Sequence, residues 1–223
     1  MIGAPRVHFR VVDSTNARAR ALAASGAPHG TLVTADEQTA GRGRQGREWT
    51  APPRSALLMS IVLRQLSESL PLAAAVAVCE ALPVPCAIKW PNDVWVERRK
   101  VAGILVEGRP QEGWAVLGIG LNVATDVFPA ELALTATSLR LAGVETTVEA
   151  VLVEVLGSLG RWLAAPGAEV LAAWRVRDAL RGESVRWANG SGVAVGVDET
   201  GALLVDTAGG RVALPAGEVH LLR

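Results

Sequence analysis

The segment Gly41–Trp49, with the sequence GRGRQGREW, places three arginines among three glycines. It lies between two segments that are typical of β-strands, Gly30–Asp36 (GTLVTAD) and the almost continuously apolar Ser55–Leu63 (SALLMSIVL). Glycine lets backbone N–H groups approach an anion closely, and arginine offers rigid, paired donors for a carboxylate or a phosphate. The segment therefore predicts a loop between strands that closes over an anionic ligand, although a solvated basic turn would have the same composition.

Strand and helix patterns alternate along the rest of the N-terminal half. Residues 7–12 (VHFRVV) predict a strand, and the cap residues Asp13–Asn16 then precede an Ala-rich helix that ends at Gly26. A second helix is predicted over Ser67–Leu82, with Pro71 in its first turn. The other segments with strand character are 87–90 (AIKW), 94–97 (VWVE), 101–107 (VAGILVE) and 114–123 (WAVLGIGLNV).

The C-terminal part changes pattern twice. From Val148 to Leu180 the apolar residues recur at helical spacing, and Pro166-Gly167 separates two helices. From about Arg181 onward, short alternating strands are separated by the turn signals NGSG, DETG and AGG. Because a β-unit of this size buries too little surface to be robust alone, we expect it to dock on the larger domain. The predicted domains are residues 1–180 and 181–223.

Composition excludes several classes of protein. Of the 223 residues, 50% are hydrophobic, so the chain can build a core and is not expected to be disordered. Basic and acidic residues number 22 each, which argues against a surface built for DNA. The N-terminus lacks the apolar block of a signal peptide, and no apolar run reaches the roughly 18 residues of a membrane span. We therefore predict a soluble, cytoplasmic protein.

Cysteine and histidine positions do not suggest a metal or disulfide framework. Cys79 and Cys86 form no CxxC pair, and the three histidines are scattered along the chain. The P-loop pattern is absent, and the glycine pair at 118–120 (GIG) lacks the rest of a dinucleotide fingerprint.

Two further clusters combine residues that could bind a ligand. Lys89–Asp93 (KWPND) places a lysine at the end of an apolar strand, from which its ammonium group could point into a site, although isolated lysines at strand ends usually reach solvent. Ser14-Thr15-Asn16 begins a predicted helix, where such residues usually act as caps. Helix N-termini with hydroxyl groups also bind polar or anionic ligands.

Five motifs in this order and at these separations resemble the biotin–protein ligases (biotin–[acetyl-CoA-carboxylase] ligases): DSTN, EQTAGRGRQGREW, KWPNDV, KVAGILVE and GIGLNV. The resemblance covers nearly the whole chain. It implies an α+β fold, in which a catalytic domain like that of class II aminoacyl-tRNA synthetases, with a mixed and largely antiparallel sheet, precedes a small SH3-like β-barrel. It also implies an ATP-dependent ligase that uses Mg²⁺, forms biotinyl-5′-AMP and transfers biotin to a lysine of a biotin carboxyl carrier protein or domain.

Some members of this family carry an N-terminal helix-turn-helix domain and act as repressors. Only about a dozen residues precede Ser14 in this sequence. We therefore expect an enzyme without a repressor role or DNA binding, as a monomer or a homodimer.

The resemblance also implies a set of site residues. Lys89 and Arg42 would be catalytic, because joining a carboxylate to a triphosphate requires cations and Mg²⁺ to neutralise the repulsion. Neutral hydroxyl and amide groups suit the ureido group of biotin. The implied biotin-binding residues are Ser14, Thr15, Asn16, Gln38, Gly41, Arg42, Gly43, Arg44, Lys89 and Gly103. The implied adenylate-binding residues are Arg42, Arg44, Arg47, Trp49, Asn92, Asp93 and Asn122, and no metal ligand is assigned.

Three alternatives remain open from the sequence. A lipoate ligase would share the superfold and the adenylate chemistry, although GRGRQGREW favours biotin. A nucleic-acid-binding module could use the Arg/Gly loop and the small β-domain, but the zero net charge, two Phe and absence of Tyr disfavour base stacking. The third alternative is an inactive binding or storage protein.

Overall fold

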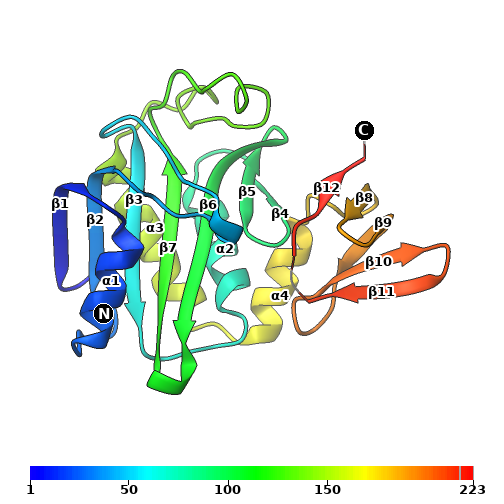
Figure 1. Cartoon of the computed structure of the whole chain (residues 1–223), viewed down its shortest axis with the longest axis horizontal. Helices are drawn as coiled ribbons and strands as arrows, with labels where there is room; N and C mark the ends of the chain where they lie inside the picture. The colour runs from blue at the N-terminus through cyan, green and yellow to red at the C-terminus, as the bar shows by residue number, and fades with distance from the viewer. Residues whose placement is uncertain (216, 223) are drawn as a thin grey trace.

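Two β-sheets organise the chain, which a computed structural model describes for residues 1–215 and 217–222 (Figure 1). The larger sheet has seven strands in the order β1-β2-β3-β7-β6-β5-β4. β1 pairs with β2 in parallel, and every other neighbouring pair in this sheet is antiparallel. The predicted mixed, largely antiparallel sheet is therefore confirmed. Its strands are β1 (Arg6–Val12), β2 (Leu32–Gln38), β3 (Ala56–Leu63), β4 (Ala87–Lys89), β5 (Asp93–Val96), β6 (Arg99–Arg109) and β7 (Trp114–Asn122).

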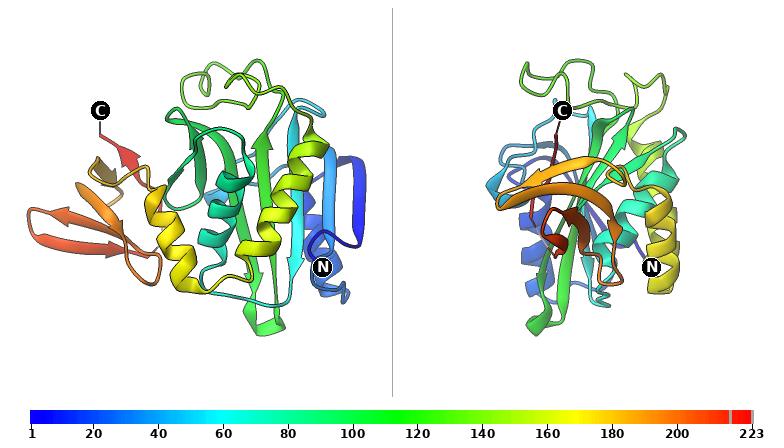
Figure 2. Two further views of the ribbon diagram at one scale, coloured as in Figure 1. Left: turned by 180° about the vertical axis from the view of Figure 1, so that it is seen from behind. Right: turned by 90° about the vertical axis from the view of Figure 1, so that its right-hand side faces the viewer.

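Helices cover both faces of this sheet (Figures 1 and 2). Helix α1 (Thr15–Ala24) covers one face, where Ala19 and Ala23 pack with Val33, Val62 and Val116. The other face carries α2 (Leu70–Ala81), α3 (Val148–Trp162) and α4 (Gly167–Val176), which share the main hydrophobic core with the sheet. Among the helices that the structure describes, none has the length and apolar character needed to cross a bilayer.

Local sequence explains where the helices begin. The side chain of Ser14 accepts a hydrogen bond from the backbone N of Ala17, so the predicted cap of α1 is confirmed. Helix α2 begins at Leu70 rather than at Ser67. The hydroxyl of Ser67 accepts a bond from the backbone N of Ser69 and lies 2.8 Å from its hydroxyl, and this local turn competes with the first helical turn. Pro71 lies in the first turn of α2, as predicted.

The smaller sheet has five strands in the order β11-β10-β9-β8-β12. Its strands are β8 (Ser184–Trp187), β9 (Gly190–Val197), β10 (Leu203–Thr207), β11 (Gly210–Leu214) and β12 (His220–Leu221), of which β12 was not predicted. Val185 and Leu203 belong to the same core as α4, so the small sheet is docked on the large unit. The indole N–H of Trp90 donates to the carbonyl of Gly201 at 3.0 Å across this contact. The domain limits at residues 180 and 181 stay a prediction.

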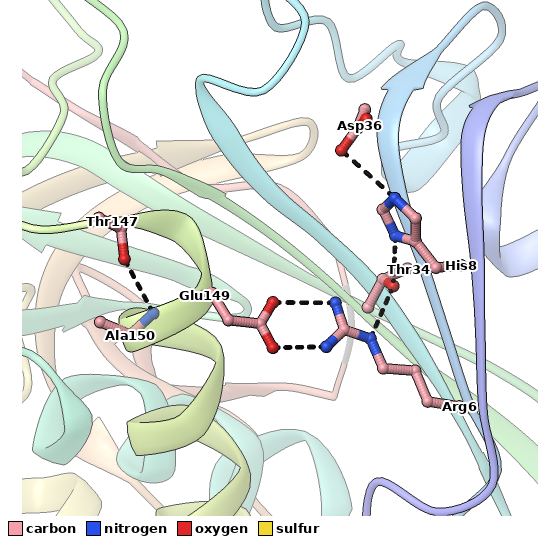
Figure 3. A network of polar contacts seen from close by, with 7 residues as sticks. All are labelled: Arg6, His8, Thr34, Asp36, Thr147, Glu149 and Ala150. Carbon is pink, nitrogen blue, oxygen red and sulfur yellow. Dashed lines mark hydrogen bonds and ion pairs between the residues drawn. The ribbon is translucent and has the colours of Figure 1, made fainter.

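A polar network ties the edge strand β1 to helix α3 (Figure 3). Arg6 on β1 donates to both carboxylate oxygens of Glu149 on α3, at 2.5 and 3.0 Å, and its Nε donates to Thr34 Oγ1 at 3.2 Å. His8 lies between Thr34 Oγ1, at 3.0 Å from its Nδ1, and Asp36 Oδ1, at 3.4 Å from its Nε2. The network therefore fixes the edge of the sheet next to the first turn of α3.

Replacing Glu149 should lower the free energy of unfolding only at pH values at which its carboxylate is ionised. The hydrogen bonds from Arg6 hold the pKa of Glu149 below its ordinary value of 4.5. Because the pKa of Glu149 is lower in the folded than in the unfolded state, the ionised carboxylate stabilises the folded protein at pH values above its unfolded-state pKa. This contribution is lost as the pH falls through the folded-state pKa. Because 63% of the Glu149 side chain is exposed, we expect Glu149→Gln to lower the free energy of unfolding at neutral pH by no more than about 1 kcal/mol.

Urea unfolding at neutral and at acidic pH measures this effect. Glu154→Gln is the matched control, because Glu154 lies exposed on the same helix and has no ion pair within the described residues. A loss of stability in Glu149→Gln that is equally large at acidic pH would contradict the assigned role of the ion pair.

Candidate functional site

The Gly41–Trp49 loop folds back on itself at one end of the large sheet. The backbone N of Trp49 donates to the carbonyl of Gly41 at 3.0 Å, and that of Gly43 donates to the carbonyl of Arg47 at 2.6 Å. Gln45 and Gly46 form the tip with φ angles of 55° and 75°. The predicted loop between strands is therefore confirmed as a closed hairpin that displays its arginine side chains.

A cavity of about 840 Å³ lies beneath this loop. Its volume is within the range of pockets that bind small organic ligands and cofactors. The loop forms one wall, β6 and the Trp90–Asn92 turn form the floor, and the start of α2 and the small sheet close the far end. Predicted site residues that line it are Gly41, Arg42, Gly43, Arg44, Arg47 and Asn92.

Neutral polar groups form a cluster where α1, β2 and β3 meet beside the loop. Gln38 Oε1 accepts bonds from the backbone N of Thr15 at 2.7 Å and from its hydroxyl at 3.0 Å. Ser60 Oγ lies 2.8 Å from Thr15 Oγ1 and 2.5 Å from Asn16 Oδ1. Thr15, Asn16 and Ser60 are buried, and all four side chains suit a neutral ligand with both donors and acceptors. Ser14, in contrast, uses its hydroxyl to cap α1.

The indole ring of Trp49 packs against Gly103 and Gly120 of the large sheet. A Cβ built on Gly120 would overlap the indole ring, and one on Gly103 would lie 3.1 Å from it. The indole Nε1 is buried and has no hydrogen-bond partner among the described residues. Lys100 Nζ lies 5.5 Å from the centre of the ring and 2.7 Å from Asp93 Oδ1. This places a cation directly beside Trp49 and Gly103.

Lys89 lies on the other side of Asp93. It lines a small recess with Arg44, Arg47 and Glu218, and its Nζ lies 5.6 Å from the ring centre of Trp95. Burial lowers the pKa of Lys89, and the neighbouring carboxylates of Asp93 and Glu218 oppose that shift. The region therefore contains two lysines, Lys89 and Lys100, of which only Lys89 is predicted from the sequence.

Two predicted asparagines make bonds to the backbone. Asn92 Nδ2 donates to the carbonyl of Ile104 at 2.7 Å, and its Oδ1 lies 3.5 Å from Arg44. Asn122 is buried and donates to the carbonyl of Thr137 at 3.0 Å. In this structure Asn122 therefore holds a neighbouring loop, whereas Asn92 is close to the cavity.

Sequence and structure comparisons agree with this arrangement. The profile of the Biotin/lipoate A/B protein ligase family matches residues 8–123, which include the Arg/Gly loop, the polar cluster and both lysines. The chain belongs to this family. The profile of the Biotin protein ligase C terminal domain matches residues 182–222.

Individual relatives match along nearly the whole chain. The biotin–[acetyl-CoA-carboxylase] ligase of Mycobacterium tuberculosis is 36% identical, over 94% of this chain and 86% of that protein. The bifunctional ligase/repressor BirA of Bacillus spizizenii is 34% identical, over 99% of this chain and 75% of that protein. The biotin protein ligase of Aquifex aeolicus in complex with biotin and ATP superposes with a TM-score of 0.86 at 31% identity, over 99% of both chains.

Three residues at the cavity or beside the polar cluster and Trp49 were not predicted to be site residues. Ser60 is the polar residue in an otherwise apolar strand, and that contrast was the signal available in the sequence. Lys100 and Glu107 open and close the motif KVAGILVE, which was recognised without assigning a role to either charged end. Glu107 lines the cavity and accepts a hydrogen bond from Asn16 Nδ2 at 2.8 Å.

The close contact between Gly118 and Asn16 can be tested directly. A Cβ at Gly118 would overlap the side-chain amide of Asn16, which its own hydrogen bonds hold in place. We expect Gly118→Ala to lower the free energy of unfolding by about 1–3 kcal/mol, as for overpacking of a well-packed interior. Thermal and urea unfolding measure the change.

Gly157→Ala in α3 is the control. A Cβ at that position meets no atom within 4 Å, so the same chemical change should raise stability by roughly 0.5–1 kcal/mol through helix propensity. Equal effects of the two substitutions would contradict the assigned contact.

Proposed function

We propose that the chain is a biotin–protein ligase, which activates biotin with ATP and transfers it to a lysine of a biotin carboxyl carrier domain. One observation supports this most strongly: a neutral polar cluster lies against Glu107 and Gly41, at the edge of the cavity that the loop arginines line. Biotin likewise has a neutral part and a charged part, a ureido group at one end and a carboxylate at the other. The relatives and structural neighbours that match nearly the whole chain are themselves named as biotin ligases.

The first half-reaction joins two anions. A carboxylate oxygen of biotin bonds to the α-phosphorus of ATP, the bond from that phosphorus to the bridging oxygen breaks, and pyrophosphate leaves. Lys100 is suited to neutralise the reacting carboxylate and α-phosphate, because its ammonium group lies beside Trp49, Gly103 and Asp93, next to the base of the loop. Arg42, Arg44, Arg47 and Lys89 line the cavity or its recess and are suited to the remaining phosphates. The neutral polar side chains of Thr15, Asn16 and Gln38 are suited to the ureido group.

The second half-reaction transfers the acyl group. The amine of the acceptor lysine attacks the acyl carbon of biotinyl-5′-AMP, a proton is lost from the amine, and AMP leaves as the amide forms. The mixed anhydride is sensitive to water, so the Arg/Gly loop has to exclude water until the acceptor arrives. The hairpin formed by Gly41–Trp49 is suited to that purpose because it borders the cavity along one whole wall.

Magnesium fits this site as part of the MgATP substrate. Within residues 1–215 and 217–222, no three acidic, histidine or cysteine side chains gather in a group that could hold a metal ion. Mg²⁺ is usually held by substrate phosphates with one or two carboxylates, so the ion that accompanies ATP does not require such a group.

The finer description of the molecule is also part of this proposal. We infer that the large unit is similar to class II aminoacyl-tRNA synthetases, that the small sheet is SH3-like, and that the two divide near residues 180 and 181. We expect a cytoplasmic monomer or homodimer that does not bind DNA. The ion pair of Arg47 with Glu218, at 2.9 Å, supports a role for the C-terminal unit in holding the loop.

Pyrophosphate exchange into ATP tests the proposed function. We expect exchange that requires biotin and Mg²⁺, because exchange reports formation of an acyl-adenylate. The family also contains lipoate ligases, so the assay is run with biotin, with lipoate and with neither. Exchange with lipoate alone would assign the chain to the sister activity, and no exchange from folded protein would overturn the proposal.

The same assay distinguishes the two lysines. Lys100→Met keeps the aliphatic stem over Trp49 but removes the charge, and we expect exchange to fall by roughly a hundredfold to a thousandfold. Lys89→Met should cause a comparable loss if Lys89 is also catalytic, as the sequence predicts. Arg99→Met is the control, because Arg99 pairs with exposed Glu97 in the adjoining turn. Near-normal exchange in either lysine variant would remove that lysine from the mechanism.

A further inference from the structure

Glu107 is an unexpected residue in a cavity that has to receive two anions. Its side chain is 26% exposed, and it lines the cavity from β6. Two guanidinium groups neutralise its charge, since Arg20 donates to Oε1 at 3.2 Å and Arg42 lies 3.9 Å from the same oxygen. The other oxygen, Oε2, accepts from Asn16 Nδ2 at 2.8 Å. The carboxylate is therefore occupied by protein partners rather than free to meet a substrate.

The carboxylate determines which way the amide of Asn16 points. An ionised carboxylate can only accept hydrogen bonds, so the atom that faces it has to be the amide nitrogen. The amide oxygen then faces Ser60, at 2.5 Å. Gly118 lies against the same oxygen and leaves no room for the side chain to move away. Asn16 is consequently held in one orientation from two sides.

This orientation extends to the next two groups in the cluster. Ser60 is fully buried and has a single proton, which it donates to Asn16 Oδ1, so its oxygen faces Thr15 as an acceptor. Thr15 is then the donor toward Ser60 or Gln38. Because Gln38 Oε1 accepts from the backbone of Thr15 at 2.7 Å, its Nε2 points away toward the base of the loop at Gly41.

We propose that Glu107 is a positioning residue that sets the donor and acceptor direction of Asn16 and Ser60 in the polar cluster, and hence the affinity of the cluster for the ureido group of biotin. This inference rests on the proposed function. The directed chain of bonds runs from Glu107 through Asn16 to Ser60, whose oxygen contacts Thr15. With Glu107 in place, Asn16 and Ser60 each have one role. Without an acceptor-only group at position 107, the amide of Asn16 can turn over and Ser60 can act as donor or as acceptor toward it.

Glu107→Gln tests this with almost no change in shape. The new amide offers a donor as well as an acceptor to Asn16, so the fixed direction is lost. We expect the Kd for biotin, measured by calorimetry, to rise roughly tenfold to a hundredfold, the range for loss of a hydrogen bond to a charged group. At saturating biotin the exchange rate should change much less, because the reacting carboxylate lies at the other end of the ligand. Biotin affinity within about twofold of the parent would overturn the inference.

Exchanging the amide and the carboxylate between positions 16 and 107 distinguishes a positioning role of Glu107 from a general structural role. Asn16→Asp alone brings two carboxylates together and should also weaken binding. The double variant N16D/E107Q exchanges the amide and the carboxylate, so position 107 donates, position 16 accepts, and Ser60 still donates to position 16. We expect it to recover most of the affinity lost in Glu107→Gln. A double variant that binds no better than the weaker single variant would overturn the inference.

Further measurements distinguish failure of this inference from misfolding of a variant and from failure of the proposed function. Arg18→Met on the exposed side of α1 should leave biotin affinity unchanged, since Arg18 pairs with Asp13 outside the cavity. If Glu107→Gln does not fold, Ser60→Ala interrupts the same chain without changing charge and should raise the Kd similarly, whereas unchanged affinity in that variant would overturn the inference. A parent protein that binds no biotin would instead overturn the proposed function.

Discussion

Burial of β3 along its whole length is the constraint on which the site depends. All eight residues of this strand are buried, between α1 on one face and the core of α2 and α3 on the other. A polar group inside such a strand is costly unless it finds partners within the protein. Ser60 is the polar residue in that position, and its partners Thr15 and Asn16 come from the start of α1. The hydrogen bonds that satisfy this buried hydroxyl thus tie the start of α1 to β3, and they hold the polar cluster together next to the base of the loop.

Three carboxylates at the cavity and its recess each have a cationic neighbour. Asp93 is paired with Lys100, Glu107 with Arg20, and Glu218 with Arg47. Arg42, Arg44 and Lys89 add positive charge at the cavity and its recess, and Glu48 and Glu68 add negative charge at the cavity, so the lining places its cations among a comparable number of carboxylates.

The elements of this fold could be predicted from the sequence wherever periodicity and caps agree. Helix α1 with Ser14, the apolar β3 and the two helices separated at Pro166 are of this kind. Strand β12 has two residues and therefore no periodic pattern to recognise. The start of α2 depends on a local serine turn that competes with helix, which propensity alone does not resolve.

The roles of site residues could be predicted less completely, because they depend on strand register. Lys89 and Lys100 both stand at strand ends beside turns, and their sequences alone do not rank them. An irregularity between Val94 and Trp95 sets the register in which Asp93 faces Gly103 and Trp95 faces Lys100. In the pairing of β6 with β7, Glu107 faces Val116, and its carboxylate meets Asn16, a residue that lies 91 positions away in the chain. Motif recognition identifies such segments, but it does not show which of their charged residues meet.

The small sheet forms part of the cavity itself, and this has a consequence for how the molecule works. Thr200, Gly201 and Pro215 close one end of the cavity, and the bond from Trp90 to Gly201 joins that end to the KWPND turn. Arg47 on the loop reaches Glu218 of the same unit at 2.9 Å. The cavity therefore exists only where the two units meet, and any displacement of the small sheet also removes an anchor of the loop. The loop and the C-terminal unit are thus linked through the Arg47–Glu218 ion pair, and because Arg47 is largely exposed this link contributes no more than about 1 kcal/mol.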